Sequence, residues 1–265
     1  MAEHLLTLTT DFGTRSPFVA AMKGVILNIN PAARILDLSH EIPPFDLRHA
    51  AFFLAEALPY FPPGTLHVVV VDPEVGSSRA LLLVSVAGQR VLVPDNGCWT
   101  LLAERYPDSL SVLRIEQQRL FRPQISSTFH GRDILAPVAA YLSLGIPSSE
   151  VGPPTHTWRK LDWPTPVHAP DGVHGEIVFV DHFGNLISNI TGSLVSAGSW
   201  VGIGSPTAKP KPARLVRTYA DASPGELVAL VSSSGLLEVA IVQGNAAQQL
   251  GAGVGTPIHL GWLKE

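Results

Sequence analysis

The sequence is poor in cysteine and in charge. It has one cysteine, Cys98, among 265 residues, and only 15% of the residues are charged. A single thiol cannot form a disulfide within the chain, so the fold must rest on its core, for which 46% hydrophobic residues are ample. The formal net charge is −4, and no long Lys/Arg cluster occurs. Binding to nucleic acid or to an anionic membrane is therefore not expected.

Long hydrophobic runs are also missing. No apolar run reaches the length of about 18 residues that a membrane span requires. The first four residues, Met-Ala-Glu-His, lead directly into a strand-like run and lack the basic and apolar regions of a signal peptide. These features predict a cytoplasmic protein.

The first part of the sequence alternates strand-like and helix-like runs. Strand-like runs occur at 5–10, 33–39, 66–71, 80–86, 90–93 and 111–115. Helical periodicity occurs at 17–29, 46–58 and 132–144, with a short helix near Thr100. Ser16 and Pro17 are the expected N-cap and first residue of the first helix. This βαβ pattern predicts an α/β domain with a central, mostly parallel sheet over residues 1–152.

The composition changes after this region. Residues 153–172 are crowded with proline and have no period, as is typical of a linker between domains. Beyond them, short strand-like runs alternate with Gly, Ser, Asn and Pro. We therefore expect residues 173–265 to form an all-β, barrel-like domain.

Two of the strand-like runs end on an aspartate. LLTLTT leads into Asp11, and LHVVVV leads into Asp72. Ligands of open α/β sheets bind at the carboxyl ends of the strands, so both carboxylates are candidate site residues. Asp72 is the stronger candidate, because a carboxylate directly after four valines is costly to desolvate unless something binds it. Asp11 also suits a local Asx turn.

The polar residues near these strand ends allow two chemical hypotheses. Asp72, Arg79 and His130 could hold and polarise one water molecule without a metal. Asp11, Asp72, His130 and Asp133, with His40, could instead serve a metal-dependent hydrolase, although no HxxxH, HExxH or DxD spacing occurs. A buried apolar role is the expectation for Cys98.

Seven segments of the sequence match motifs that occur together, in the same order, in one protein family. They are Leu8–Gly13, Asp37–Asp46, Val70–Arg79, Val93–Gly97, Phe129–Asp133, Asp181–Ile190 and Ser232–Ala247. Together they resemble the S-adenosylmethionine hydroxide adenosyltransferases, which are hydrolytic relatives of the adenosylmethionine-dependent fluorinase and chlorinase. The resemblance covers nearly the whole chain.

The resemblance implies an N-terminal α/β domain, a C-terminal β-barrel and a homotrimer. Adenosylmethionine would lie between the N-terminal domain of one subunit and the C-terminal domain of its neighbour. Water or hydroxide would attack C5′ of the ribose and release adenosine and methionine, with no metal and no cofactor. A non-catalytic binder of adenosine or adenosylmethionine is the third possibility, beside a metal-dependent hydrolase.

The resemblance also assigns roles to individual residues. Asp72, Arg79 and His130 match the catalytic set. The implied substrate-binding residues are Asp11 at the ribose hydroxyls, Phe45 along the sugar, Asn185 with Phe183 at adenine, and Ser233, Ser234, Asn245 and Ala246 around methionine and the adenine edge.

Two further positions bear on the choice between hydrolysis and halogenation. The halogenating relatives offer a serine hydroxyl at the position of Gly131, and the carboxylate of Asp72 would repel a halide ion. The sequence departs from the family at Glu74, where glycine is usual. Glu74 adds a second carboxylate to the turn that carries Asp72 and Arg79.

Overall fold

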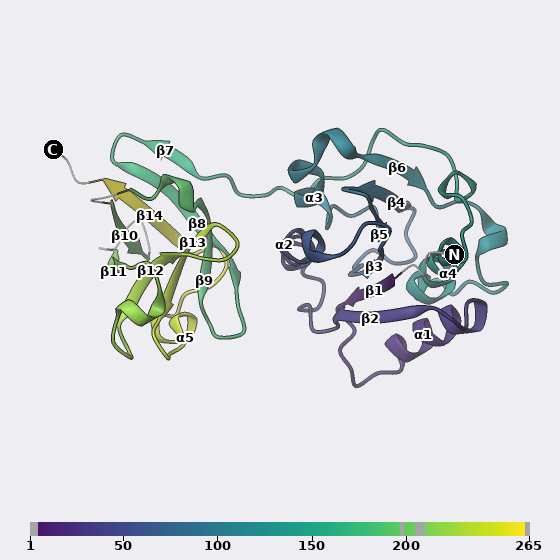
Figure 1. Cartoon of the computed structure of the whole chain (residues 1–265), viewed down its shortest axis with the longest axis horizontal. Coiled ribbons are helices and arrows are strands. Elements are labelled where there is room, and N and C mark those ends of the chain that lie inside the picture. The colour runs from purple at the N-terminus through teal and green to yellow at the C-terminus, as the bar shows by residue number, and fades with distance from the viewer. Residues whose placement is uncertain (1–4, 197–198, 205–209, 263–265) are drawn as a thin grey trace. The chain divides into compact units, whose positions relative to one another are not determined.

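The computed structural model describes residues 5–196, 199–204 and 210–262. The chain folds into two compact units, one ending at Leu161 and the other beginning at Asp162 (Figure 1). Within the described residues, no helix has the length and apolar character needed to cross a membrane.

The first unit is built on a sheet of six described strands in the order β2-β1-β3-β5-β4-β6. Their bounds are β1 Leu5–Thr10, β2 Arg34–Ser39, β3 Leu66–Val70, β4 Leu81–Val86, β5 Gln89–Pro94 and β6 Ser111–Arg114. The first four strands in this order are parallel, whereas β4 runs antiparallel to β5 and β6. Ala87 and Gly88 between β4 and β5 both have positive φ, which suits a two-residue hairpin. The prediction of an α/β unit is confirmed, and its sheet contains both parallel and antiparallel pairs.

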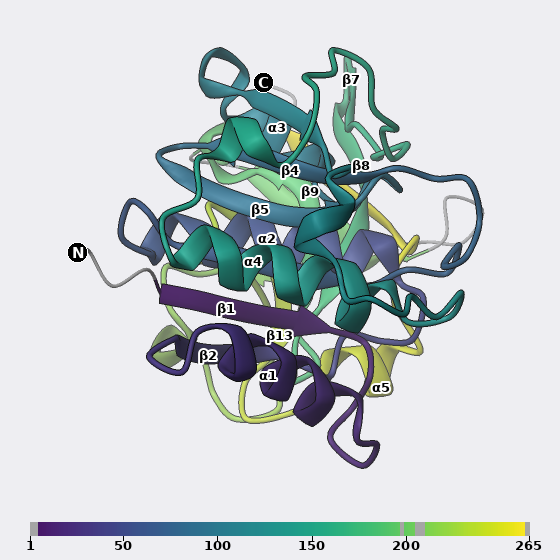
Figure 2. The same ribbon diagram turned by 90° about the vertical axis from the view of Figure 1, so that its right-hand side faces the viewer.

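Helices cover both faces of this sheet. Helices α1 (Phe18–Ile29) and α4 (Ala136–Ser143) lie on one face, and α2 (Leu47–Ala57) and α3 (Thr100–Arg105) lie on the other (Figures 1 and 2). The prediction for the start of α1 was wrong by one residue. Pro17 is the N-cap, because its ψ of 2° is not helical, and its carbonyl accepts from Ala21 N.

A π-helical turn at Gly131–Leu135 precedes α4. Pro137 has no N–H to donate to the carbonyl of Asp133, and Arg122 N donates to that carbonyl instead, at 3.0 Å. The proline therefore breaks the regular helix predicted over 132–144. Such π turns often lie at functional sites, and His130 stands directly before this one.

The second unit is a closed β-barrel, as predicted. Seven described strands form it, in the order β14-β10-β11-β12-β13-β9-β8, and β8 pairs with β14 to close the ring. The bounds are β8 Gly172–Val180, β9 Leu186–Thr191, β10 Ser199–Ile203, β11 Lys211–Leu215, β12 Leu227–Val231, β13 Leu236–Ile241 and β14 Pro257–Trp262. The short strand β7 (Val167–Ala169) pairs with β8 outside the ring, and helix α5 spans Ala246–Leu250.

The proline-rich stretch 153–172 makes defined contacts along much of its length. Arg114 N donates to Pro153 O at 2.9 Å, and Arg159 N donates to Asp95 Oδ1 at 2.8 Å. Trp158 packs against Trp99 in the first unit, with ring centroids 5.1 Å apart. The stretch lacks helices and strands before β7, yet its first residues are attached to the α/β unit.

Candidate active site

An ion pair between Asp72 and Arg79 lies at the carboxyl end of β3. Arg79 Nε donates to Oδ1 and Oδ2 of Asp72 at 2.7 and 2.9 Å, and Nη2 also donates to Oδ2. The side chains are only 1% (Arg79) and 5% (Asp72) exposed. The connecting turn passes through Gly76, whose φ of 84° favours glycine and where a Cβ would lie 2.4 Å from Ser127 O. The turn therefore places two opposite charges together and makes them a neutral unit.

His130 extends this pair. Arg79 Nη2 lies 3.1 Å from His130 Nδ1. Because the guanidinium has only donors, Nδ1 must accept, and the proton of the neutral ring must be on Nε2. Burial and the positive charge of Arg79 lower the pKa of His130. The structure therefore favours a neutral His130 that offers Nε2–H as a donor.

Asp11 lies at the end of β1, as the sequence predicts. Its Oδ2 accepts from Phe45 N at 2.9 Å, a contact far from its own turn in sequence. Burial raises the pKa of Asp11, and the bond from Phe45 partly opposes that rise. Phe45 has a φ of 67°, which is unfavourable for a bulky residue, and the residue is 69% exposed. Strained backbone of this kind is concentrated at ligand sites.

A pocket of about 290 Å³ brings these groups together. Asp11, Phe45, Asp72 and His130 line it, whereas Arg79 does not line it and is buried in its pair with Asp72. Part of its apolar wall is a cluster of Phe12, Phe18 and Phe129, whose ring centroids are 5.3 to 5.6 Å apart. Sequence reasoning missed these three, although Phe12 and Phe129 are adjacent to Asp11 and His130. Apolar walls with a few convergent polar groups are typical of small-molecule sites.

The structure gives Asp133 a different role. It is fully buried, accepts from Arg122 and Arg132 at 2.7 to 2.8 Å, and also accepts from Ser126 N. These donors lower its pKa to about 2 despite the opposing effect of burial. Asp133 therefore stabilises the turn that carries His130.

The metal hypothesis finds little support in this unit. Among the described residues, one group brings three candidate ligand atoms within 4.8 Å of one another, and it consists of Asp171, His174 and His259 in the barrel. In the pocket, Arg79 already neutralises Asp72. The residues Asp11, Asp72, His130, Asp133 and His40 do not form such a group.

Glu74 and Cys98, two residues that the sequence singles out, take no part in this site. Glu74 pairs with Arg159 at 2.5 Å, so it does not compete for Arg79. Cys98 is fully buried, as expected, and burial raises the pKa of its thiol. A thiol in that state is a poor nucleophile.

The barrel carries a second pocket of about 700 Å³, lined by the predicted residues Phe183, Asn185 and Ser233. Asp181 shapes its rim, because Oδ1 accepts from Phe183 N and Asn185 N and Oδ2 accepts from Asn185 Nδ2, all within 2.9 Å. This network holds the Asn185 side chain in one orientation while Phe183 remains 71% exposed.

The other predicted barrel residues lie outside the lining of this pocket. Ser234 Oγ is 2.7 Å from Ser232 Oγ, and Asn245 Oδ1 caps helix α5 by accepting from Gln248 N. Ala246 is fully buried in the barrel core. These contacts are structural, and they keep the loops beside the pocket in place.

Sequence reasoning missed a buried acid in this pocket. Glu238 on β13 is 4% exposed and accepts from Tyr219 Oη at 2.5 Å. Burial is the main cause of its raised pKa, with the nearby charge of Asp181 acting in the same direction. A lone carboxylate within the apolar run LLEVAIV was the available signal.

Comparison with known proteins assigns the family. Residues 6–152 match the SAM hydroxide adenosyltransferase N-terminal domain, and residues 175–259 match the C-terminal domain. The chain belongs to the SAM hydroxide adenosyltransferase family.

Individual relatives agree with this assignment. The chain is 39% identical to an (R)-S-adenosyl-L-methionine hydrolase of Thermus thermophilus, over 95% of this chain and 97% of that protein. It is 37% identical to a protein of the same name from Salinispora tropica, over 96% and 97%. It also resembles the crystal structure of an uncharacterized conserved protein from Thermotoga maritima, with a TM-score of 0.89, 37% identity, and coverage of 97% and 99%.

Proposed function

We propose that this protein hydrolyses S-adenosyl-L-methionine to adenosine and L-methionine. The hydrolase relatives and the family assignment support the reaction. The observation that carries the proposal is the chain of contacts from Asp72 through Arg79 to His130 at the edge of the pocket. These groups suit the orientation of one water molecule.

In the proposed mechanism, water attacks C5′ directly. The C5′–O bond forms as the C5′–S bond breaks, and the bonding pair leaves with sulfur as a neutral thioether, so no acid is needed there. Free water has a pKa of about 15.7, so the protein must stabilise its developing hydroxide character. Asp72 Oδ1 accepts one bond from Arg79 and keeps a lone pair for the proton of the water. His130 Nε2–H would donate to the oxygen of the attacking water.

The same proposal assigns the binding groups. Asp11 would accept from the two ribose hydroxyls, and Phe45 would pack along the sugar. Asn185 and Phe183 would hold adenine. Ser233, which lines the barrel pocket, would contact the methionine portion and the adenine edge, and Ser234, Asn245 and Ala246 would keep the adjoining loops in place. The reaction needs no metal and no cofactor, and the negative charge of Asp72 disfavours halide as the nucleophile.

One assay separates this function from its alternatives. Purified protein is incubated with adenosylmethionine, with and without a chelator, and adenosine is quantified. We expect equal adenosine in both samples. Product that disappears with the chelator would favour a metal-dependent hydrolase, and ligand bound but recovered unchanged would favour a binding protein.

Asp11→Ala is expected to weaken adenosine binding by about 1.5–3 kcal/mol, the usual range for charge-assisted hydrogen bonds. Calorimetric titration with adenosine measures the change. Asp108→Ala removes an exposed carboxylate outside the pocket and serves as the control. Unchanged affinity in Asp11→Ala would refute the role of Asp11.

We further propose a homotrimer in which the α/β unit of one subunit and the barrel of its neighbour complete each site. Support comes from the family resemblance and from the fact that each unit carries only part of the predicted residue set. The cytoplasmic location stays a prediction.

Mixing two inactive variants tests the shared site. Asp72→Ala and Asn185→Ala proteins, dissociated and reassembled together, are expected to recover part of the activity, because some sites then receive two intact units. Adenosine formation is the readout, and mass spectrometry verifies that mixed oligomers have formed. Mixed oligomers without activity at any ratio would contradict a site shared between subunits.

A further inference from the structure

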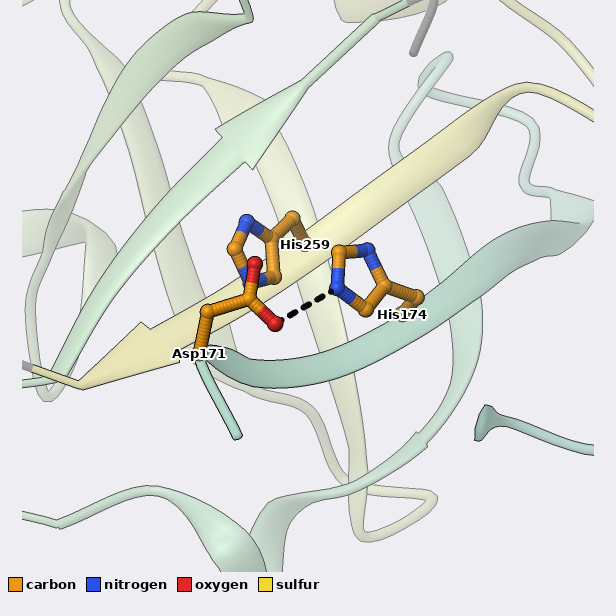
Figure 3. A group of neighbouring side chains, drawn as sticks. All are labelled: Asp171, His174 and His259. Atoms are coloured by element: carbon orange, nitrogen blue, oxygen red, sulfur yellow. Dashed lines mark hydrogen bonds and ion pairs between the residues drawn. The ribbon is translucent and has the colours of Figure 1, made fainter. Parts of the chain in front are cut away.

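Three potential metal ligands meet on the barrel where its first and last strands pair. His174 on β8 lies directly opposite His259 on β14, and Asp171 precedes β8 in the turn from β7 (Figure 3). The β8–β14 pairing closes the barrel. None of the three residues lines either pocket described above.

The spacing of the three side chains is close to that of a metal site. Asp171 Oδ1 is 3.1 Å from His174 Nε2, and Asp171 Oδ2 is 3.8 Å from His259 Nε2. Ligands at about 2.0–2.1 Å from a tetrahedral ion lie roughly 3.3 Å from one another. One atom from each residue falls within 4.8 Å of the other two. Small side-chain movements would therefore bring three ligands to bonding distance.

The environment of one ring nitrogen also supports a metal site. His259 Nε2 is buried and makes no hydrogen bond of regular geometry, although the backbone of Asp171 interacts with this ring and buried polar atoms usually have a partner. Gly172 leaves space for it, because a Cβ at that position would lie 2.8 Å from this nitrogen. Trp200 packs edge-on against the His259 ring at 4.7 Å. The ring is thus held in place with Nε2 toward Asp171.

The two imidazole rings stack, with centroids 4.1 Å apart and planes at 11°. Each nitrogen lone pair lies in its ring plane, and one ion cannot lie in two stacked, nearly parallel planes, so one ring must tilt for both to reach the same ion. The side chain of His174 is 47% exposed, whereas that of His259 is 14% exposed. His174 is therefore the ligand that would tilt.

We propose that Asp171, His174 and His259 bind one divalent first-row transition-metal ion, with Zn²⁺ as the probe, and that this ion clamps the seam between β8 and β14. Two imidazoles and one carboxylate are preferred ligands of such ions, and water would complete the coordination. The ion would stabilise the closed barrel by linking the turn before β8 to the last strand. The clamp is separate from the proposed hydrolysis.

Calorimetric titration of the full chain tests the site. The protein carries no polyhistidine tag and is stripped with a chelator before Zn²⁺ is added. We expect one Zn²⁺ per chain, with affinity at least about tenfold weaker in His174→Ala, His259→Ala and Asp171→Asn. His168→Ala is the matched control. His168 on β7 pairs with Val173, so its side chain lies on the face of the sheet opposite to that of His174. It should bind like the unaltered chain.

Thermal unfolding provides a second readout. Zn²⁺ is expected to raise the Tm of the unaltered chain and of His168→Ala, and to leave the Tm of the three ligand variants unchanged. Absence of a saturable site would overturn the proposal, and so would His174→Ala and His259→Ala variants that bind Zn²⁺ as tightly as the unaltered chain does. Adenosine formation should be the same with and without Zn²⁺, and a loss on metal removal would contradict the separation of clamp and catalysis.

Discussion

Asp72→Asn is expected to lower kcat for adenosine formation by about 10²–10⁴-fold, with a smaller change in KM. The carboxylate is the proposed acceptor of the water proton, and its charge orients Arg79 and, through it, His130. The amide keeps the shape of the side chain but loses the negative charge. Steady-state kinetics at saturating adenosylmethionine measures the effect.

The same change is expected to reduce stability. Removing one partner of a buried ion pair typically costs about 3–5 kcal/mol, because the other charge is left uncompensated. Kinetics should therefore be measured at a temperature where chemical denaturation shows the variant to be folded.

Glu74→Gln is the matched control for Asp72→Asn. Glu74 lies two residues away in the same turn, but its partner is the exposed Arg159. An exposed ion pair contributes little to stability, so we expect kcat to stay within about twofold. Equal losses in the two variants, or an undiminished kcat in Asp72→Asn, would contradict the assignment of Asp72.

The second large effect concerns His130 and pH. Because the pKa of His130 is lowered from its ordinary value near 6.5, the neutral ring persists at neutral pH. As the pH falls through the lowered pKa, Nδ1 becomes protonated and can no longer accept from Arg79. We expect kcat to be flat above about pH 6.5 and to decline below it.

His130→Asn is expected to reduce kcat by about 10²–10⁴-fold and to remove this acidic decline. Protonation of Asp11, whose pKa is raised, would chiefly weaken substrate binding as the pH falls. Measuring kcat at saturating substrate therefore isolates the protonation of His130. His156→Asn changes an exposed histidine outside both pockets and should leave the profile intact. An acidic decline that persists in His130→Asn would show that another group causes it.

Much of the architecture was visible in the sequence because its signals are local. A strand-like run that ends on a charge places that charge at the edge of the sheet, and Asp11 and Asp72 both follow this rule. The pairing of Arg79 with Asp72 needed only a short turn between them. The short, regularly spaced runs of the second half likewise indicated a barrel.

Other features depend on contacts that no local pattern encodes. The positive φ of Phe45 accompanies a bond to Asp11, which belongs to a different segment of the chain. The carbonyl of Asp133 receives its donor from Arg122 across a loop, so the π turn before Pro137 could not be read from periodicity. His174 and His259 meet only through the register of β8 and β14. Contacts between separate segments of the chain decide each of these cases.

The stereochemical course at C5′ tests the central claim most directly. Adenosylmethionine that carries deuterium in one configuration at C5′ is converted to adenosine, and the configuration of the product is determined by NMR. Direct displacement by a water molecule held at Asp72, Arg79 and His130 predicts inversion. Net retention would contradict this mechanism, because it requires two displacements and a covalent adenosyl-enzyme.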